Sequence, residues 1–168
     1  LSGEAAAEGE ILLPDYCPTV MKVVGVTATP FLRSQTVRGD RLYADGNVEF
    51  RIVYISDAAE GLQTVSHRLP FSYSAQVGAS EENVFATVSA SVEYRSARAL
   101  SPQKLYAKAA VVISASVYAP VATELPDDET KSRAELLKTS VDVTDVVASS
   151  TRTLRLTEDI DAGDAKVD

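Results

Sequence analysis

Alternation of apolar and polar side chains over residues 42–52, with Tyr54 continuing the apolar parity, constrains the fold of this chain more than any other feature. Successive side chains of a β-strand point to opposite faces, so this pattern predicts one long, half-buried strand. Asp45-Gly46 resembles a two-residue hairpin turn, but a turn there would mix apolar and polar residues on each face. We therefore interpret Gly46 as a bulge or a close backbone approach within a continuous strand. The apolar parity consists of Leu42, Ala44, Gly46, Val48, Phe50, Ile52 and Tyr54.

Three further segments show strand signals. Residues 23–37 predict a strand, and Pro30 inside it either places the strand at a sheet edge or splits it in two. Gly39-Asp40 predicts the turn that follows. Residues 65–71 alternate as well, and their apolar parity contains His67, which predicts a histidine packed in the core.

A long hairpin is predicted over residues 84–117. Its first strand alternates through Val92 and Tyr94 on the inward parity, and its second strand covers residues 105–117. The connecting turn, residues 99–104, contains Pro102. Alanines on the inward parity of both strands indicate a closely packed layer beneath them.

Composition agrees with these strands. Hydrophobic residues make up 45% of the 168 residues, which is enough for a packed core, and tryptophan is absent. The predicted fold class is all-β: an antiparallel β-sandwich or a partly open barrel of about six to eight strands, with at most one or two short helices.

A proline-rich elbow follows the first ten residues. In the sequence Leu13-Pro14-Asp15-Tyr16-Cys17-Pro18, each proline fixes its own φ and drives the preceding residue out of the helical region, so the segment predicts a rigid, extended connection. We interpret it as architecture, because no reacting group needs such a spacing.

The remaining segments suggest the organisation of the chain. Residues 1–10, small and acidic, predict a leader, and residues 11–122 a single β domain. Residues 123–138 predict a linker with a possible short helix. Residues 139–168 predict either the leader and start of a second repeat or strands that complete the sheet, and Asp159-Ile160 faintly repeats Glu10-Ile11.

Charge and cysteine content narrow the function. The formal net charge is −8, which disfavours binding to nucleic acid and to anionic membranes, and no apolar run approaches the roughly 20 residues of a membrane-spanning helix. Cys17 is the sole cysteine, so an intrachain disulfide is impossible and a reducing, cytoplasmic setting fits best. We interpret Cys17 as a small buried hydrophobe.

No motif for catalysis is present. The sequence lacks a phosphate-binding loop, a dinucleotide fingerprint, a zinc-protease motif and a nucleophile elbow, and His67 has no flanking motif. The acids Glu49, Glu93, Asp57 and Glu60 are interpreted as solvated face or loop residues. The acidic residues 158–168 have the wrong order for a calcium loop. The chain is therefore expected to be no enzyme, with no cofactor, no metal site and no catalytic residue.

Several short motifs occur together in a recognisable order. They are Leu13-Pro14-Asp15-Tyr16-Cys17-Pro18, Gly39-Asp40-Arg41-Leu42, Gly46-Asn47-Val48, Val53-Tyr54, Leu69-Pro70-Phe71 and Ala99-Leu100-Ser101-Pro102-Gln103-Lys104. This ordered set resembles the SPOCS domain of endospore-forming Firmicutes over about residues 8–120. Thr19-Val20 and Ser101-Pro102-Gln103-Lys104 depart from the usual Asp-Ile and Asn-Pro-Arg-Lys of the family, so no ligand-binding role transfers to those side chains. The resemblance assigns a structural part to Pro14, Asp15, Cys17, Pro18, Gly39, Asp40, Gly46, Pro70, Phe71 and Pro102.

The resemblance implies a non-catalytic module for protein interaction in assembly of the spore coat, in the cytoplasm of the mother cell at the forespore surface. The implied partners are other spore-coat or morphogenetic proteins and further copies of the chain. Family members often carry tandem copies ahead of a LysM module, which leads to an alternative: a β-sandwich that binds peptidoglycan.

Two expectations concern surfaces. Tyr43, Tyr106 and Tyr118 lie on the predicted outward parity, where tyrosine favours an interface because it buries a large area at low entropic cost. Open strand edges in residues 139–168 would favour a homodimer through that segment.

Overall fold

The computed structural model describes residues 1–57, 59–78, 84–119 and 142. The chain divides into two compact units, Leu1–Thr123 and Glu124–Asp168. The predicted linker over residues 123–138, the predicted repeat or strands over residues 139–168 and the acidic cluster of residues 158–168 lie outside the described residues, apart from Asp142.

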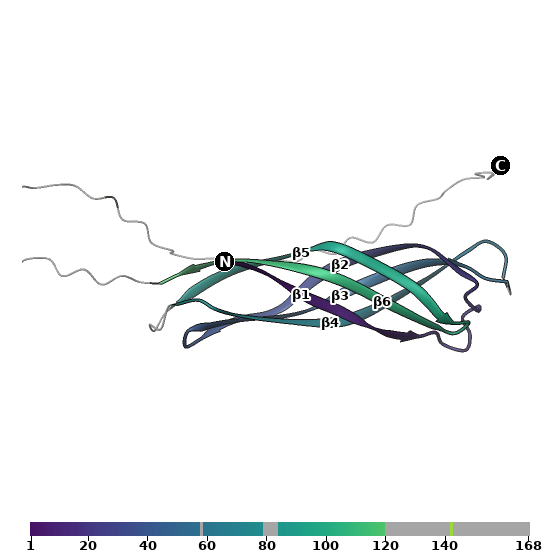
Figure 1. The fold of residues 1–168 in the computed structure, drawn as a ribbon, viewed down its shortest axis with the longest axis horizontal. Helices are drawn as coiled ribbons and strands as arrows, with labels where there is room; N and C mark the ends of the chain where they lie inside the picture. The colour runs from purple at the N-terminus through teal and green to yellow at the C-terminus, as the bar shows by residue number, and fades with distance from the viewer. Residues whose placement is uncertain (58, 79–83, 120–141, 143–168) are drawn as a thin grey trace, which may run out of the picture. The chain divides into compact units, whose positions relative to one another are not determined.

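The described residues of the first unit form six antiparallel strands in two sheets (Figure 1). Sheet A has the order β1-β6-β5 and sheet B the order β2-β3-β4. The sheets pack face to face without closing into a barrel, and no helix occurs among the described residues, so the predicted all-β sandwich is confirmed. The strands are β1 (Ser2–Leu12), β2 (Lys22–Arg38), β3 (Arg41–Ile55), β4 (Leu62–Gln76), β5 (Phe85–Ser101) and β6 (Lys104–Tyr118).

The core lies between the sheets and is built from the inward parity of the two central strands. Strand β3 is continuous from Arg41 to Ile55, as its alternation predicts. At Gly46 the neighbouring strands leave no room for a side chain. A Cβ there would collide with the carbonyl oxygen of Phe31 in β2 and with the ring of Phe71 in β4. The largest fully buried side chains are Tyr54, Phe50, Ile11, Leu42, Ile52, Leu105, Ile113, Val48 and Val111.

The prediction of a leader over residues 1–10 is wrong. Ser2–Leu12 forms strand β1, which pairs with β6 along its whole length. Glycine and alanine have low strand propensity, which is why the sequence alone suggested a leader. Their small size is what the packing requires. A Cβ on Gly3 would strike the Tyr73 side chain of β4, and a Cβ on Gly9 would lie 3.1 Å from Leu69 Cδ2.

The connections between strands follow the glycine and proline signals. Gly39 adopts φ +58° in the two-residue turn between Arg38 and Arg41, a conformation that glycine tolerates best. Of the two alternatives that Pro30 left open, the structure shows the first, because β2 is one continuous strand at the edge of sheet B. Pro102 and Gln103 join the paired residues Ser101 and Lys104 at the tip of the predicted hairpin.

The elbow carries the chain from sheet A to sheet B. The Cys17 N–H donates to the Pro14 carbonyl at 2.8 Å, which closes a turn. The elbow is fixed to the hairpin tip because the Leu13 N–H donates to the Gln103 carbonyl at 2.9 Å and the Val20 N–H to the Pro102 carbonyl at 2.7 Å. Every one of these bonds uses backbone atoms.

His67 is exposed, so the prediction of a core histidine is wrong. It shares the inward parity of β4 with the buried Leu69 and Phe71 and pairs with the buried Phe50 of β3. Strand β4 is an edge strand, however, and the sandwich leaves its inner side open to solvent at this position. The alternation of side chains along one strand does not show whether that strand lies in the centre or at the edge of its sheet.

Candidate interaction surface

The structure separates the three tyrosines that the sequence singled out. Tyr106 and Tyr118 both lie on the outer face of sheet A, about 40 Å apart along β6 at roughly 3.4 Å per residue. Tyr43 lies on the outer face of sheet B, on the other side of the sandwich. Tyr43 is 40% and Tyr118 49% exposed, so each remains accessible, but they form no common patch.

Tyr106 belongs to a polar cluster that joins all three strands of sheet A. Its hydroxyl donates to Glu8 Oε2 at 3.0 Å, and Lys108 Nζ lies 3.1 Å from the same oxygen. From the other side, the Arg98 guanidinium of β5 lies 5.5 Å from the centre of the Tyr106 ring. Glu8 of β1, Tyr106 and Lys108 of β6 and Arg98 of β5 therefore hold one another in place.

The protonation of this cluster follows from its hydrogen bonds. Lys108, and then Tyr106, donate to Glu8 and lower the pKa of its carboxyl group. The same contacts raise the pKa of Tyr106 and of Lys108, because each loses its bond to the carboxylate when it gives up a proton. At neutral pH the tyrosine is thus neutral and the lysine charged.

A second ion pair extends the cluster toward the hairpin tip. Lys104 Nζ of β6 lies 2.6 Å from Glu10 Oε2 of β1. Two acidic residues of β1 thus pair with lysines of β6: Glu8 with Lys108 directly across the ladder, and Glu10 diagonally with Lys104. Ion pairs this exposed contribute little to stability, so they determine the character of the surface more than they hold the sheet together.

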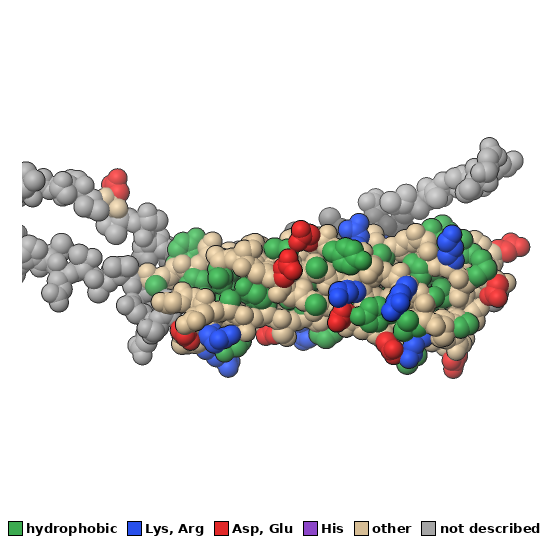
Figure 2. All heavy atoms as spheres, viewed as in Figure 1, with side chains coloured by type: hydrophobic (Ala, Val, Ile, Leu, Met, Phe, Trp, Pro, Cys, Tyr) green, Lys and Arg blue, Asp and Glu red, His purple; other side chains and the backbone are tan. Residues whose placement is uncertain are grey.

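Exposed hydrophobic residues surround these charges. Leu12 of β1 is 71% exposed, Tyr94 of β5 is 56% and Leu100 of β5 is 42%. Figure 2 shows basic, acidic and hydrophobic side chains side by side on the end of sheet A where β5 and β6 join. We call this surface the turn-end face; it consists of Glu8, Glu10, Leu12, Tyr94, Arg98, Leu100, Lys104, Tyr106 and Lys108.

The sequence placed Tyr94 on the wrong face. The register of β5 against β6 shifts between Val92 and Tyr94, where β5 has a bulge. Because of this bulge, Tyr94 points outward and pairs with Ala110, which also points outward. A bulge inserts one residue and inverts every side chain beyond it, and nothing in the local sequence marked this one. Arg98 was missed for the same reason. The outward parities of β1 and β6 could have pointed to Glu8 and Lys108, had β1 been recognised as a strand.

The residues to which the SPOCS resemblance assigned a structural role lie mainly in turns or pack against the core. The Pro18 carbonyl accepts a hydrogen bond from Tyr54 at 3.1 Å, and Asp40 accepts bonds from Gln76 and Val77. Phe71 is buried, Pro70 lies in the edge strand β4, and Asp15 is exposed. Cys17 is half-buried and packs against the core. None of these residues belongs to the turn-end face.

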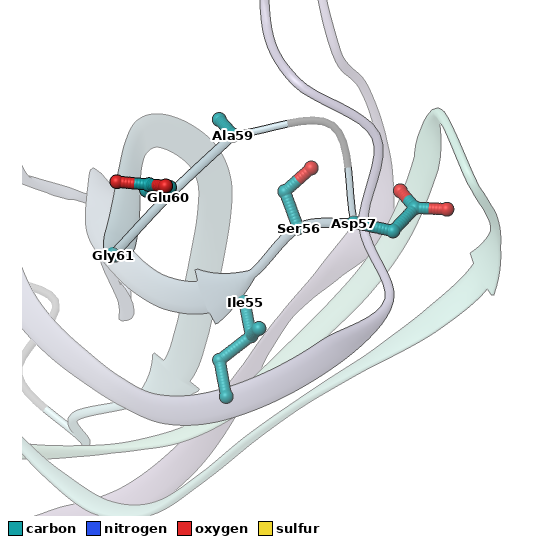
Figure 3. A pocket seen from close by; sticks show the side chains of 6 residues that line it. All are labelled: Ile55, Ser56, Asp57, Ala59, Glu60 and Gly61. Carbon is teal, nitrogen blue, oxygen red and sulfur yellow. The ribbon is translucent and has the colours of Figure 1, made fainter.

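A hollow of about 450 Å³ lies beside the loop that joins β3 to β4. It is lined by Ile55, Ser56, Asp57, Ala59, Glu60 and Gly61 (Figure 3). The carboxylates of Asp57 and Glu60 point away from each other, so they do not form a pair for acid–base chemistry. Asp57 instead accepts a hydrogen bond from Thr19 Oγ1 at 2.8 Å, which ties the loop to the elbow.

Among the residues that the structure describes, no cluster of three or more histidine, cysteine or acidic residues is arranged to hold a metal ion. Within the same residues, no helix is long and apolar enough to span a membrane.

The fold and the turn-end face define a β-sandwich module whose exposed surface carries aromatic, basic and acidic residues together. The family model described as SipL, SPOCS domain matches residues 19–100. This match confirms, over residues 19–100, the resemblance to the SPOCS domain family stated from the sequence. The match covers β2, β3, β4 and nearly all of β5. No curated protein and no solved structure matches the chain.

Proposed function

We propose that this chain is a non-catalytic module for protein interaction in assembly of the spore coat. The observation that carries the proposal is the SPOCS match over residues 19–100, which suggests a sporulation-related role. The proposed place of action is the mother-cell side of the forespore surface. The proposed partners are spore-coat or morphogenetic proteins.

The turn-end face supports a protein as the partner. Tyrosine and arginine are enriched at the energetic centres of protein interfaces, and both occur here beside exposed leucines. The Glu8 carboxylate holds the Tyr106 hydroxyl and the Lys108 ammonium in fixed positions. Such preorganisation lowers the entropic cost of binding, because these side chains are already ordered in the free protein.

Peptidoglycan binding, the alternative, receives less support from this geometry. A sugar ring stacks on an open aromatic face, but the Arg98 guanidinium lies over the ring of Tyr106. Tyr94 is the aromatic residue of this face with the larger exposed area, and one ring offers little platform for a glycan. We therefore place protein binding first.

The direct test is to titrate the purified chain with individual purified coat-scaffolding proteins and measure affinity by calorimetry. Tyr94→Ala should weaken the binding of a true partner by about 10- to 30-fold, the range expected of an interface hot spot. Tyr43→Ala is the matched control, because it removes an exposed tyrosine from the other sheet. Its affinity should stay within about twofold of the wild type.

Two outcomes would reject the proposal. One is the absence of binding to every scaffolding protein at concentrations of about 100 µM. The other is retention on insoluble peptidoglycan that Tyr94→Ala or Tyr106→Ala abolishes, which would establish the alternative.

A further inference from the structure

Within the described part of the chain, four strands lie at sheet edges, and these edges differ in how well they are protected. Edge strands expose unpaired backbone groups, and proteins commonly guard them with prolines, bulges or covering groups. Strand β2 contains Pro30 and two register shifts, and β5 contains two register shifts as well. Strand β4 contains Pro70.

The β2 and β5 edges also cover each other. Arg95 Nε of β5 donates to the Val26 carbonyl of β2 at 3.1 Å. Gln35 Nε2 of β2 lies 3.4 Å from the Ala86 carbonyl of β5 and donates to it. On the side of the sandwich where β2 and β5 meet, side chains therefore donate hydrogen bonds to backbone carbonyls of the opposite edge strand.

Among the described residues, no proline, bulge or hydrogen-bonded side chain protects the open edge of β1. The strand contains no proline, and it pairs one-to-one with β6 from Ser2 to Leu12 without a register shift. Ala6, at its middle, is exposed. Regular, unguarded edges of this kind are ready templates for another strand.

The hydrogen-bond pattern shows which groups of β1 are free. Leu1 and Ala115 exchange both backbone bonds, at 2.9 and 2.8 Å, and the Leu13 N–H donates to the Gln103 carbonyl. In an antiparallel ladder, bonded pairs recur at every second residue. The odd residues of β1 therefore bond to β6, and the even residues direct their N–H and C=O groups to the open side. Those residues are Ser2, Glu4, Ala6, Glu8, Glu10 and Leu12.

The charge of this edge favours one class of occupant. The even residues also point outward, and three of them are exposed glutamates: Glu4, Glu8 and Glu10. Glu8 and Glu10 already pair with Lys108 and Lys104, so Glu4 offers an incoming strand the least compensated charge. In a second copy paired antiparallel through the same strand, acids would approach acids, and like charges across a ladder are destabilising. An incoming strand with lysine or arginine at its outward positions would place opposite charges there instead.

We propose that the free edge of β1 binds an extended segment of a partner protein as an added β-strand, and that the segment carries basic side chains at alternate positions. The proposal rests on the proposed function and gives it a site and a partner chemistry. The added strand bonds to the even residues of β1. Its outward basic side chains lie beside Glu4 and along the margin of the turn-end face.

Amide hydrogen exchange followed by NMR provides the test. In the free full chain, the amides of residues 5, 7, 9 and 11 should be protected and those of residues 4, 6, 8 and 10 should exchange quickly. The probe is a blocked peptide in which lysine alternates with valine. Its addition should slow exchange at the even residues at least about tenfold, whereas a glutamate–valine peptide should not.

Two variants separate the edge from general charge effects. Glu4→Lys should weaken binding of the lysine peptide about fivefold, and Glu93→Lys, which makes the same charge change on β5, should have little effect. Ala6→Pro removes an edge donor and should reduce affinity at least about tenfold. Protected odd amides would show that this variant is folded.

Several results would overturn the proposal. Even amides that the peptide leaves unprotected would show that the edge takes no strand. Even amides already protected in the free chain would show that the edge is occupied, by a second copy if dilution exposes them or by residues 120–168 if their deletion does. If coat proteins bind Glu4→Lys and Ala6→Pro as tightly as wild type, the proposed function stands and the edge proposal fails.

Discussion

Gly46 offers the sharpest test of the sandwich, because its environment leaves no room for even a methyl group. The Gly46→Ala Cβ would overlap the Phe31 carbonyl oxygen on β2 and would lie 2.7 Å from Phe71 Cε1 on β4. The ring of Phe71 could rotate away. The carbonyl could not, because Leu32, the next residue of β2, is paired with Gly46 itself.

The cost should lie at the upper end of the range for overpacking a core, about 3 kcal/mol. For a domain of this size that corresponds to a fall in melting temperature of roughly 10 °C. The Gly46→Ala substitution should also lower the urea midpoint of unfolding by about 1.5 to 2 M. Gly25→Ala is the matched control, since it makes the same substitution in a neighbouring strand where a Cβ meets nothing within 4 Å. It should leave stability unchanged or raise it by about 0.5 kcal/mol.

Urea unfolding followed by circular dichroism measures both variants against the wild type. The slope of the transition should stay constant, which would show that only the native state has changed. Equal midpoints for Gly46→Ala and Gly25→Ala would refute the reasoning. They would mean that β2 and β4 do not flank Gly46 as the structure places them.

Three other predictions concern the elbow, the surface cluster and the domain limits. Tyr54→Phe should lower the free energy of unfolding by about 1 kcal/mol, measured by urea titration, because it removes the hydrogen bond to the Pro18 carbonyl. The depressed pKa of Glu8 stabilises the fold above the ordinary carboxylate range, and this contribution is lost as pH falls through the depressed value. The gap in urea midpoint between wild type and Glu8→Gln should therefore be largest near neutral pH and close in acid; a constant gap would contradict this. A fragment limited to residues 19–100 should fail to unfold cooperatively on heating, because it lacks β1 and β6.

The central strands could be predicted from the sequence because their surroundings are simple. Strand β3 has neighbours on both edges and a core on one face, so burial follows parity from Leu42 to Tyr54. The turn at Gly39 could be predicted because it needs a backbone conformation that few residues adopt. Such features depend on local chemistry, which the sequence displays directly.

The features that were mispredicted depend on distant partners. Strand β1 exists because β6 supplies its hydrogen bonds and because Tyr73 and Leu69 need small residues opposite them. His67 is exposed because its strand lies at an edge, which is a property of topology. Tyr94 faces outward because of the bulge between Val92 and Tyr94. The turn-end face depends on two of these causes, the pairing of β1 with β6 and the bulge in β5, so it could not be predicted from any single strand.

The limits of the family match and of the folding unit differ for a physical reason. The match covers residues 19–100 and therefore all of sheet B but only β5 of sheet A. Strand β6 is the centre of sheet A and bonds to both β1 and β5, so β5 on its own has no neighbour within its sheet. The inward residues of β3 would then lose the buried residues Leu105, Val111 and Ile113 as packing partners. A sandwich is stable only when both sheets bury their inner faces, so the smallest unit that folds must include β1 and β6. The open edge of β1 therefore belongs to the folding unit itself. A partner that adds a strand there extends sheet A beyond β1, at the edge opposite β5.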